Sequence, residues 1–145
     1  MVKSISGETC LRYMELLPKN REIGDPPLPI TLTRQGQVKG PFDYVLPDQL
    51  LIALRKWLND RGDNSVFYFL TESVEGEETD FEISVPELTH TTLSDINVAN
   101  ENLIVGHEFD WALFTDHEGI LHVAGPEDLF SFLKDYENYE EKGYG

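Results

Sequence analysis

The stretch FDWALFTDHEGILHVAGPEDLFSFLKDY, residues 109–136, contains the pattern that decides the fold class. After a strand-like piece at residues 103–105, residues 110–115 and 120–125 have the composition of two short strands, and the first of these two has apolar side chains on both faces. The turn between them, DHEG, ends in Gly119, and glycine adopts positive φ without steric cost. The sequence therefore predicts a β-hairpin in this region.

A helix is predicted directly after this hairpin. Pro126 suits the first turn of a helix, and the acidic residues that follow it favour the positive end of the helix dipole. The apolar residues then have helical spacing, at Leu129, Phe132, Leu133 and Tyr136. The last residues, 137–145, are acidic and end in glycine, so we expect them to form a frayed acidic tail.

Residues 65–85 predict a second hairpin. The apolar run 66–70 is too short for a helix and rich in aromatic residues, which indicates a strand buried on both faces. Residues 79–85 alternate between apolar and polar side chains, as expected for a strand with one buried face. The polar segment between the two strands forms the predicted loop.

The clearest helical pattern spans residues 47–62. Pro47 suits the first turn, and Gly62 suits the position just after the last turn. The apolar residues fall on one helical face, at Leu50, Leu51, Leu54, Trp57 and Leu58. This segment predicts an amphipathic helix packed against the sheet.

The remaining segments give weaker patterns. Residues 6–18 fit a short helix with Ser6 as its N-cap. Residues 30–34 fit a short strand, and the glycine-containing segment 36–41 predicts a turn. Residues 87–101 mix polar and apolar side chains without a clear period, so we expect irregular structure there.

Together these elements predict an α+β fold, in which an antiparallel or mixed β-sheet of about 4–6 strands has helices packed on one face. The chain of 145 residues has the length of one ordinary domain, so we expect residues 1–145 to form a single domain. The alternating strand and helix order of a doubly wound parallel sheet is missing from the sequence.

Acidic residues are concentrated in the second half of the chain. The formal net charge is −16, and residues 71–145 hold 19 Asp and Glu against 2 Lys and Arg, whereas residues 1–70 hold 8 against 9. Such a surface repels nucleic-acid phosphates, so we expect no direct nucleic-acid binding. The same charge would attract a basic protein partner.

The sequence also gives expectations about location and redox chemistry. No stretch approaches the roughly 20 apolar residues needed to cross a bilayer, and the N-terminus lacks the apolar region of a signal peptide. We therefore expect no membrane association and a cytoplasmic location. The single cysteine, Cys10, lies among apolar residues, which indicates a buried side chain more than a nucleophile.

Catalytic and metal-binding motifs are weak. His107, His117 and His122 lie near several carboxylates, but they lack the same-face spacing that metal ligands prefer. The sequence contains no phosphate-binding glycine loop and no nucleophile elbow of the G-x-S-x-G type. We therefore predict no cofactor and no metal site, and we expect a binding protein more than an enzyme.

These observations favour a small, acidic, non-catalytic protein that neutralises or regulates a basic protein partner. The most concrete version is a bacterial toxin-immunity protein or an inhibitor that mimics nucleic acid. The contact candidates are acidic and aromatic residues, namely Asp110, Trp111, Asp116, Glu118, Tyr136 and Tyr139. Two alternatives stay open: a hydrolase that uses Asp and His residues of 107–122, with or without a metal, and a regulatory or scaffold subunit that self-associates into a homo-oligomer through its aromatic sheet face.

Overall fold

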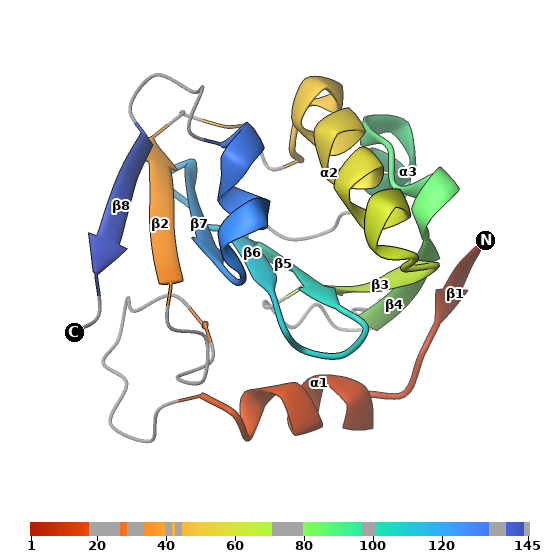
Figure 1. Ribbon diagram of the computed structural model, residues 1–145. Helices are drawn as coiled ribbons and strands as arrows, with labels where there is room; N and C mark the ends of the chain where they lie inside the picture. The colour runs from red at the N-terminus through yellow and green to blue at the C-terminus, as the bar shows by residue number, and fades with distance from the viewer. Residues whose placement is uncertain are drawn as a thin grey trace.

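The computed structural model describes residues 1–17, 27–28, 34–39, 42, 45–70, 80–96, 101–133 and 139–143. These residues form one eight-stranded sheet with helices on both of its faces (Figure 1). The strands are β1 (Val2–Ser4), β2 (Arg34–Lys39), β3 (Ser65–Leu70), β4 (Asp80–Ser84), β5 (Asn102–Gly106), β6 (Ala112–Thr115), β7 (Ile120–Ala124) and β8 (Tyr139–Gly143). The helices are α1 (Glu8–Met14), α2 (Asp48–Arg61) and α3 (His90–Ile96), with two 3-10 helices, η1 (Val85–Glu87) and η2 (Glu127–Phe132).

The strand order across the sheet is β1-β4-β3-β5-β6-β7-β2-β8, and each neighbouring pair is antiparallel. The two predicted hairpins are confirmed, as β3 with β4 and β6 with β7. The α+β class is confirmed as well. The sheet has more strands than expected because β1 and β8, from near the two ends of the chain, add an edge strand on each side (Figure 1).

Two local predictions were wrong near the β8 edge. Residues 139–143 do not fray, because they pair with β2 from Arg34 to Val38. Residues 36–39 belong to β2, where a turn was predicted, and β2 lies between β7 and β8. Both segments depend on hydrogen bonds to strands more than 80 residues away along the chain, and local patterns carry no information about such pairing.

Helix α2 covers one face of the sheet. Its five predicted core residues are all buried, and Gly62 ends the helix in the left-handed region with φ 82°. The side chains pack on the β3, β6 and β7 residues that face the same way, among them Tyr68, Leu113 and Val123. Complete burial of one leucine contributes on the order of 2 kcal/mol, so this layer is a main source of stability.

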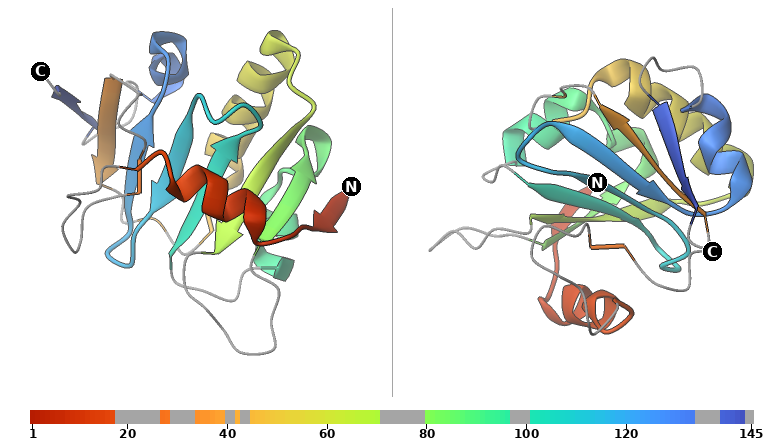
Figure 2. Two further views of the ribbon diagram at one scale, coloured as in Figure 1. Left: turned by 90° about the horizontal axis from the view of Figure 1, so that it is seen from below. Right: turned by 90° about the vertical axis from the view of Figure 1, so that its left-hand side faces the viewer.

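The opposite face of the sheet is covered by α1 (Figure 2). The buried Tyr13 of α1 packs with Phe69 of β3, and its hydroxyl donates a hydrogen bond to the carbonyl of Pro27. The prediction that helices pack on one face was therefore incomplete, because α1 covers the other face. Strand β3 is buried on both faces, so an apolar cover on the second face is required.

Helix α3 forms where irregular structure was predicted. Its first residue, His90, donates its backbone N–H to the Asp48 side chain of α2, at 2.9 Å. Arg55 of α2 donates to the carbonyl of Leu88, just before α3, at 2.6 Å. The α3 segment is thus held by side chains of α2, which its own sequence does not reveal.

The segment after β7 forms the 3-10 helix η2 where an α-helix was predicted. Pro126 is its N-cap, and Leu129 and Phe130 are buried against the α2 layer. The predicted stripe residue Tyr136 lies outside the described residues. None of the helices within the described parts of the chain is long and apolar enough to span a membrane.

Candidate functional site

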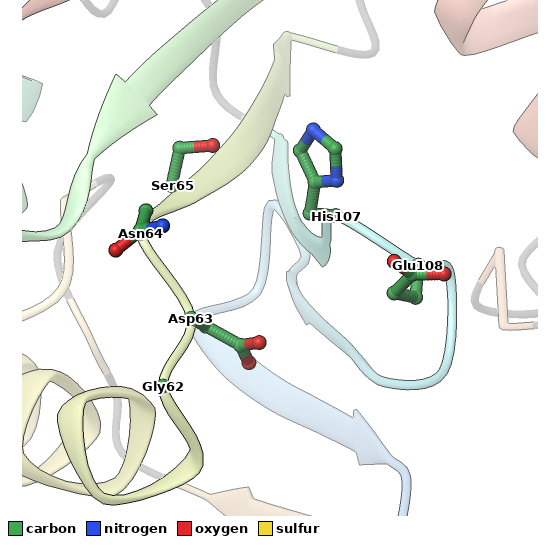
Figure 3. A pocket seen from close by; sticks show the side chains of 6 residues that line it. All are labelled: Gly62, Asp63, Asn64, Ser65, His107 and Glu108. Atoms are coloured by element: carbon green, nitrogen blue, oxygen red, sulfur yellow. The ribbon is translucent and has the colours of Figure 1, made fainter.

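A polar hollow of about 400 Å³ opens at the end of the sheet where β3 begins and β5 ends. Two connections supply its wall, the link from α2 to β3 and the loop from β5 to β6 (Figure 3). The lining residues are Gly62, Asp63, Asn64, Ser65, His107 and Glu108. Polar and charged side chains dominate this set, so the hollow suits a polar or charged ligand group.

The link from α2 to β3 positions Asp63. Gly62 donates its N–H to the carbonyl of Asn59, and Asp63 donates to the carbonyl of Leu58, both at 3.0 Å. These two bonds satisfy carbonyls of the last helical turn and make the chain reverse into β3. The Asp63 carboxylate then points toward the loop that carries Glu108 (Figure 3).

The loop from β5 to β6 presents His107 and Glu108. Phe109 donates its N–H to the carbonyl of Gly106 at 2.9 Å and has φ 59°, a region that bulky residues rarely adopt. Its ring packs against Tyr13 and Phe67, with ring centroids 5.6 and 5.9 Å away. Apolar packing of this ring offsets the backbone strain and leaves the two preceding residues exposed at the turn.

Arg61 is shared by two carboxylates at the rim of the hollow. Its Nε lies 3.2 Å from Asp63 Oδ2, and its Nη2 bonds to Asp110 Oδ2. The guanidinium also lies over the Trp57 ring, 4.5 Å from the centroid. Glu108 is a third carboxylate, for which the described residues supply no ion pair or hydrogen bond. The rim therefore carries three carboxylates and the single guanidinium of Arg61, so its net charge is negative.

A second polar group adjoins the hollow across β1, β4, β3 and β5. Glu82 accepts a hydrogen bond from Ser65 Oγ at 2.8 Å, and its carboxylate lies 3.3 Å from Lys3 Nζ and 3.6 Å from His107 Nε2. The Ser65 hydrogen bond is the largest cause that lowers the pKa of Glu82, with smaller help from Lys3 and His107. The His107 ring also stacks on Phe67, with centroids 5.1 Å apart. His107 thus lies at the edge of the hollow between the Phe67 ring and the Glu82 carboxylate.

The opposite end of the sheet carries the turn between β6 and β7. Asp116 Oδ1 accepts the backbone N–H groups of Glu118 and Ile120 at 2.9 and 3.0 Å, and its Oδ2 lies 2.9 Å from His122 Nε2. Burial alone would raise the pKa of Asp116, but these hydrogen bonds together outweigh it and lower the pKa. Asp116 is therefore occupied in holding its own turn.

A second histidine at this end is paired with Glu101. His117 Nδ1 lies 3.0 Å from Glu101 Oε2, and this hydrogen bond is the main cause that raises the pKa of the fully exposed imidazole. Neither His117 nor His122 lies near His107, which is at the other end of the strands. The structure thus divides the three histidines between two sites.

The predicted contact residues are divided in the same way. Asp110 lies at the rim of the hollow, whereas Asp116 and Glu118 lie at the far turn. Trp111, just before β6, is completely buried against Trp57 and cannot touch a partner, because its side chain packs in the α2 layer. Tyr136 lies outside the described residues, and of Tyr139 only the backbone, in β8, is described.

Arg61, Asp63 and Glu108 were not predicted as site residues. A local signal was available for the first two, since the charged pair flanks the glycine that ends the clearest helix. Glu108 was considered only as one of the carboxylates near the three histidines, in a metal site that was not predicted. Nothing local indicated that residues 61–63 and 108–110 would meet, because residues 64–107, which include the three strands β3, β4 and β5, separate them.

The hollow has a limited range of chemistry. Within the described parts of the chain, no three His, Cys, Asp or Glu side chains are placed to hold a metal ion together. The carboxylate of Glu82 lies between Ser65 and His107 and accepts the hydrogen bond of the Ser65 hydroxyl. His107 is therefore not placed as a general base for this hydroxyl. The arrangement can bind a cation through charge and hydrogen bonds.

Compared with known proteins, the chain matches no protein-family model, no curated protein and no solved structure. Relationship to other proteins therefore contributes nothing to the functional assignment.

Proposed function

We propose that this protein is a non-catalytic acidic binding protein that neutralises or regulates a basic protein partner. The observation that supports this proposal best is the hollow beside Arg61, where Asp63 and Asp110 share one guanidinium and Glu108 pairs with no described residue. A basic partner would supply the missing positive charge at this rim. The net charge of −16 adds a long-range attraction that raises the association rate.

In its most concrete form, the proposal is a bacterial cytoplasmic immunity protein, or an inhibitor that presents carboxylates in place of nucleic-acid phosphates. Both would cover a basic, nucleic-acid-binding surface on the partner. Acidic side chains of the second half of the chain support this version, since they outnumber the basic ones there by 19 to 2. A repulsive charge balance also argues against direct contact with nucleic acid.

The two alternatives receive less support. The hydrolase hypothesis uses Asp and His residues of 107–122. Asp116 and His122 do lie 2.9 Å apart, but Asp116 also accepts two backbone hydrogen bonds of its own turn, and His107 lies at the other end of the sheet. The self-association hypothesis needs an open aromatic sheet face, and helices cover both faces over the described residues. A homo-oligomer would therefore have to use a different surface.

The product of the gene adjacent to this one is the first ligand to test, because immunity proteins are encoded next to their toxins. We expect saturable binding by calorimetry with a dissociation constant below about 1 μM at low salt, weakening as the salt concentration rises. Glu108→Lys should weaken binding by about tenfold or more. Glu118→Lys, the same charge change at the other sheet end, is the matched control and should weaken it by about twofold.

Absence of saturable binding at low salt by a basic product of that gene would contradict the proposal. Binding that both variants weaken equally would keep the function but remove the hollow as its contact surface. Circular dichroism and a thermal melt of each variant would confirm that the fold is retained.

A further inference from the structure

We infer that the hollow receives an arginine side chain of the partner, with its guanidinium held between Asp63 and Glu108. The inference rests on the proposed function and deepens it, because it names the group that the site recognises. The hollow lies between the α2–β3 link and the β5–β6 loop, which supply one of these carboxylates each (Figure 3).

Both carboxylates have oxygens available for a ligand. Asp63 uses Oδ2 for Arg61, at 3.2 Å, and no described group bonds to its Oδ1. Glu108 lines the hollow and is exposed, and the described residues leave both of its oxygens unpaired. A guanidinium has five N–H donors in a planar fork, so it can bond to two carboxylates that face it from different sides.

The molecule already holds one guanidinium in this way. Arg61 lies between the carboxylates of Asp63 and Asp110, with its plane over the Trp57 ring. The hollow offers a comparable set on the other side of Asp63, with Glu108 as the second carboxylate and the His107 ring as the flat surface. Phe67 stacks on His107, and the Glu82 carboxylate lies 3.6 Å from its Nε2, so both groups restrict the ring before a ligand arrives.

Other ligand classes fit less well. A phosphate or other anion would meet the negative rim and be repelled. A divalent cation would need three or more close ligands, and the described residues supply no such group. A lysine ammonium carries the right charge, but it is a strongly hydrated point charge that cannot form the planar, two-sided contact.

The test uses three small probes and the full chain. Nα-acetyl-arginine amide, the corresponding lysine amide and the neutral citrulline amide are titrated into ¹⁵N-labelled protein at low salt. We expect the arginine probe to shift the amide resonances of residues 62–65 and 106–110 with a millimolar dissociation constant. The lysine probe should bind about threefold to fivefold more weakly, and the citrulline probe should shift none of them.

A matched pair of variants identifies the carboxylate responsible. Glu108→Gln should weaken the arginine probe by about threefold to fivefold, the range expected for one exposed ion pair. Glu118→Gln removes the same charge at the far turn and should leave the affinity within about twofold. Both side chains are exposed, so the fold should be retained, and the reference spectra report directly on that.

Three results would overturn the inference. They are equal binding of the arginine and lysine probes, equal weakening by the two variants, and no shift in residues 62–65 and 106–110 at about 50 mM arginine probe. Each result would leave the proposed function standing, because a basic protein can bind this chain elsewhere on its acidic surface. Failure of the proposed function is separate, as it appears as loss of salt-dependent binding to the basic protein itself.

Discussion

The two ends of the sheet use the same residue types in different ways. At the hollow, Asp63 pairs with Arg61 through one oxygen, and Glu108 is exposed and pairs with no group of the described residues. At the far turn, one oxygen of Asp116 accepts two backbone hydrogen bonds of its own turn, and the other contacts His122. A carboxylate next to a histidine therefore does not identify a functional site. What distinguishes the ends is whether the carboxylate is already satisfied.

This difference has an energetic side. Satisfied carboxylates stabilise the fold and should be costly to remove, whereas exposed unsatisfied ones should matter for binding and little for stability. The predictions below measure stability at both ends, from the largest expected effect to the smallest. They complement the binding experiments on Glu108 and Glu118.

The largest effect is expected behind the hollow, at Gly106. A Cβ added there would lie 2.2 Å from Trp111 Nε1, so the buried indole would have to move. Gly106→Ala should lower the free energy of unfolding by about 3 kcal/mol, measured by urea denaturation. Gly62→Ala is the control, with no atom within 4 Å but φ 82°, and should cost about 1 kcal/mol. Equal losses would show that the wall behind the hollow is not rigid.

Asp116→Ala should have the next largest effect. Loss of two backbone hydrogen bonds and of the His122 contact should lower the free energy of unfolding by about 2 kcal/mol near pH 7. Glu118→Ala, two residues away in the same turn, should change it by less than about 0.5 kcal/mol.

The Asp116 effect should depend on pH. Its pKa in the folded protein is lowered below the ordinary value of 3.8, so the ionised form favours the fold. The contribution is complete well above pH 3.8 and is lost as the pH falls below 3.8 through the folded pKa. The wild type and Asp116→Ala should therefore differ less at low pH, and an unchanged difference there would contradict this assignment.

Glu82→Gln should have a smaller effect at the hollow end. The glutamine keeps a hydrogen-bond acceptor for Ser65 but loses the ion pair with Lys3, so we expect a loss of about 1 kcal/mol near pH 7. The pKa of Glu82 is lowered from 4.5, so this contribution is present above pH 4.5 and is lost as the pH falls below it. A denaturation series between pH 3 and pH 7 provides the measurement, and a greater difference at the acid end would reverse the assigned sign.

The smallest effect is the titration of His117. Its pKa is raised above 6.5, mainly through the hydrogen bond to Glu101. Any stabilisation by the charged imidazole is complete below pH 6.5 and lost as the pH rises through the folded pKa. An NMR titration should show Glu101→Gln moving this pKa back toward 6.5, and an unchanged value in the variant would exclude Glu101 as the cause.

Secondary structure was predicted best for elements whose buried apolar residues have a regular spacing along the chain. Helix α2 was predicted with its five core residues and its terminal glycine, because the spacing and the end signal are both local. Strands β3, β4, β6 and β7 were predicted for the same reason. In β6, for example, Leu113 and Phe114 are buried on opposite faces of the sheet. Such patterns fix which face of an element is buried, whatever it packs against.

Predictions failed where an element depends on a distant segment. Strand β8 has a charged and polar sequence that resembles a frayed tail, but β2 offers it a complete row of backbone partners. Helix α3 has few apolar residues, and Asp48 and Arg55 of α2 stabilise its start. In both cases the stabilising groups lie more than 30 residues away along the chain.

The candidate site shows the same division. Asp110 was identified from its acidic, aromatic surroundings. Its neighbour Trp111 was misplaced, because the packing against Trp57 that buries it joins residues 54 positions apart in the chain. Arg61 and Asp63 were overlooked as site residues. Their importance depends on the β5–β6 loop, which the strand order brings beside the end of α2.

By itself, the sequence determined the α+β class, the amphipathic α2 helix, the two hairpins and the acidic balance of the second half, since these are properties of local spacing and composition. Only the tertiary structure decided which carboxylates are satisfied and which face solvent around a hollow. The physical reason is that a hydrogen-bond partner is chosen by distance in space, and antiparallel pairing of eight strands brings together groups from distant parts of the chain.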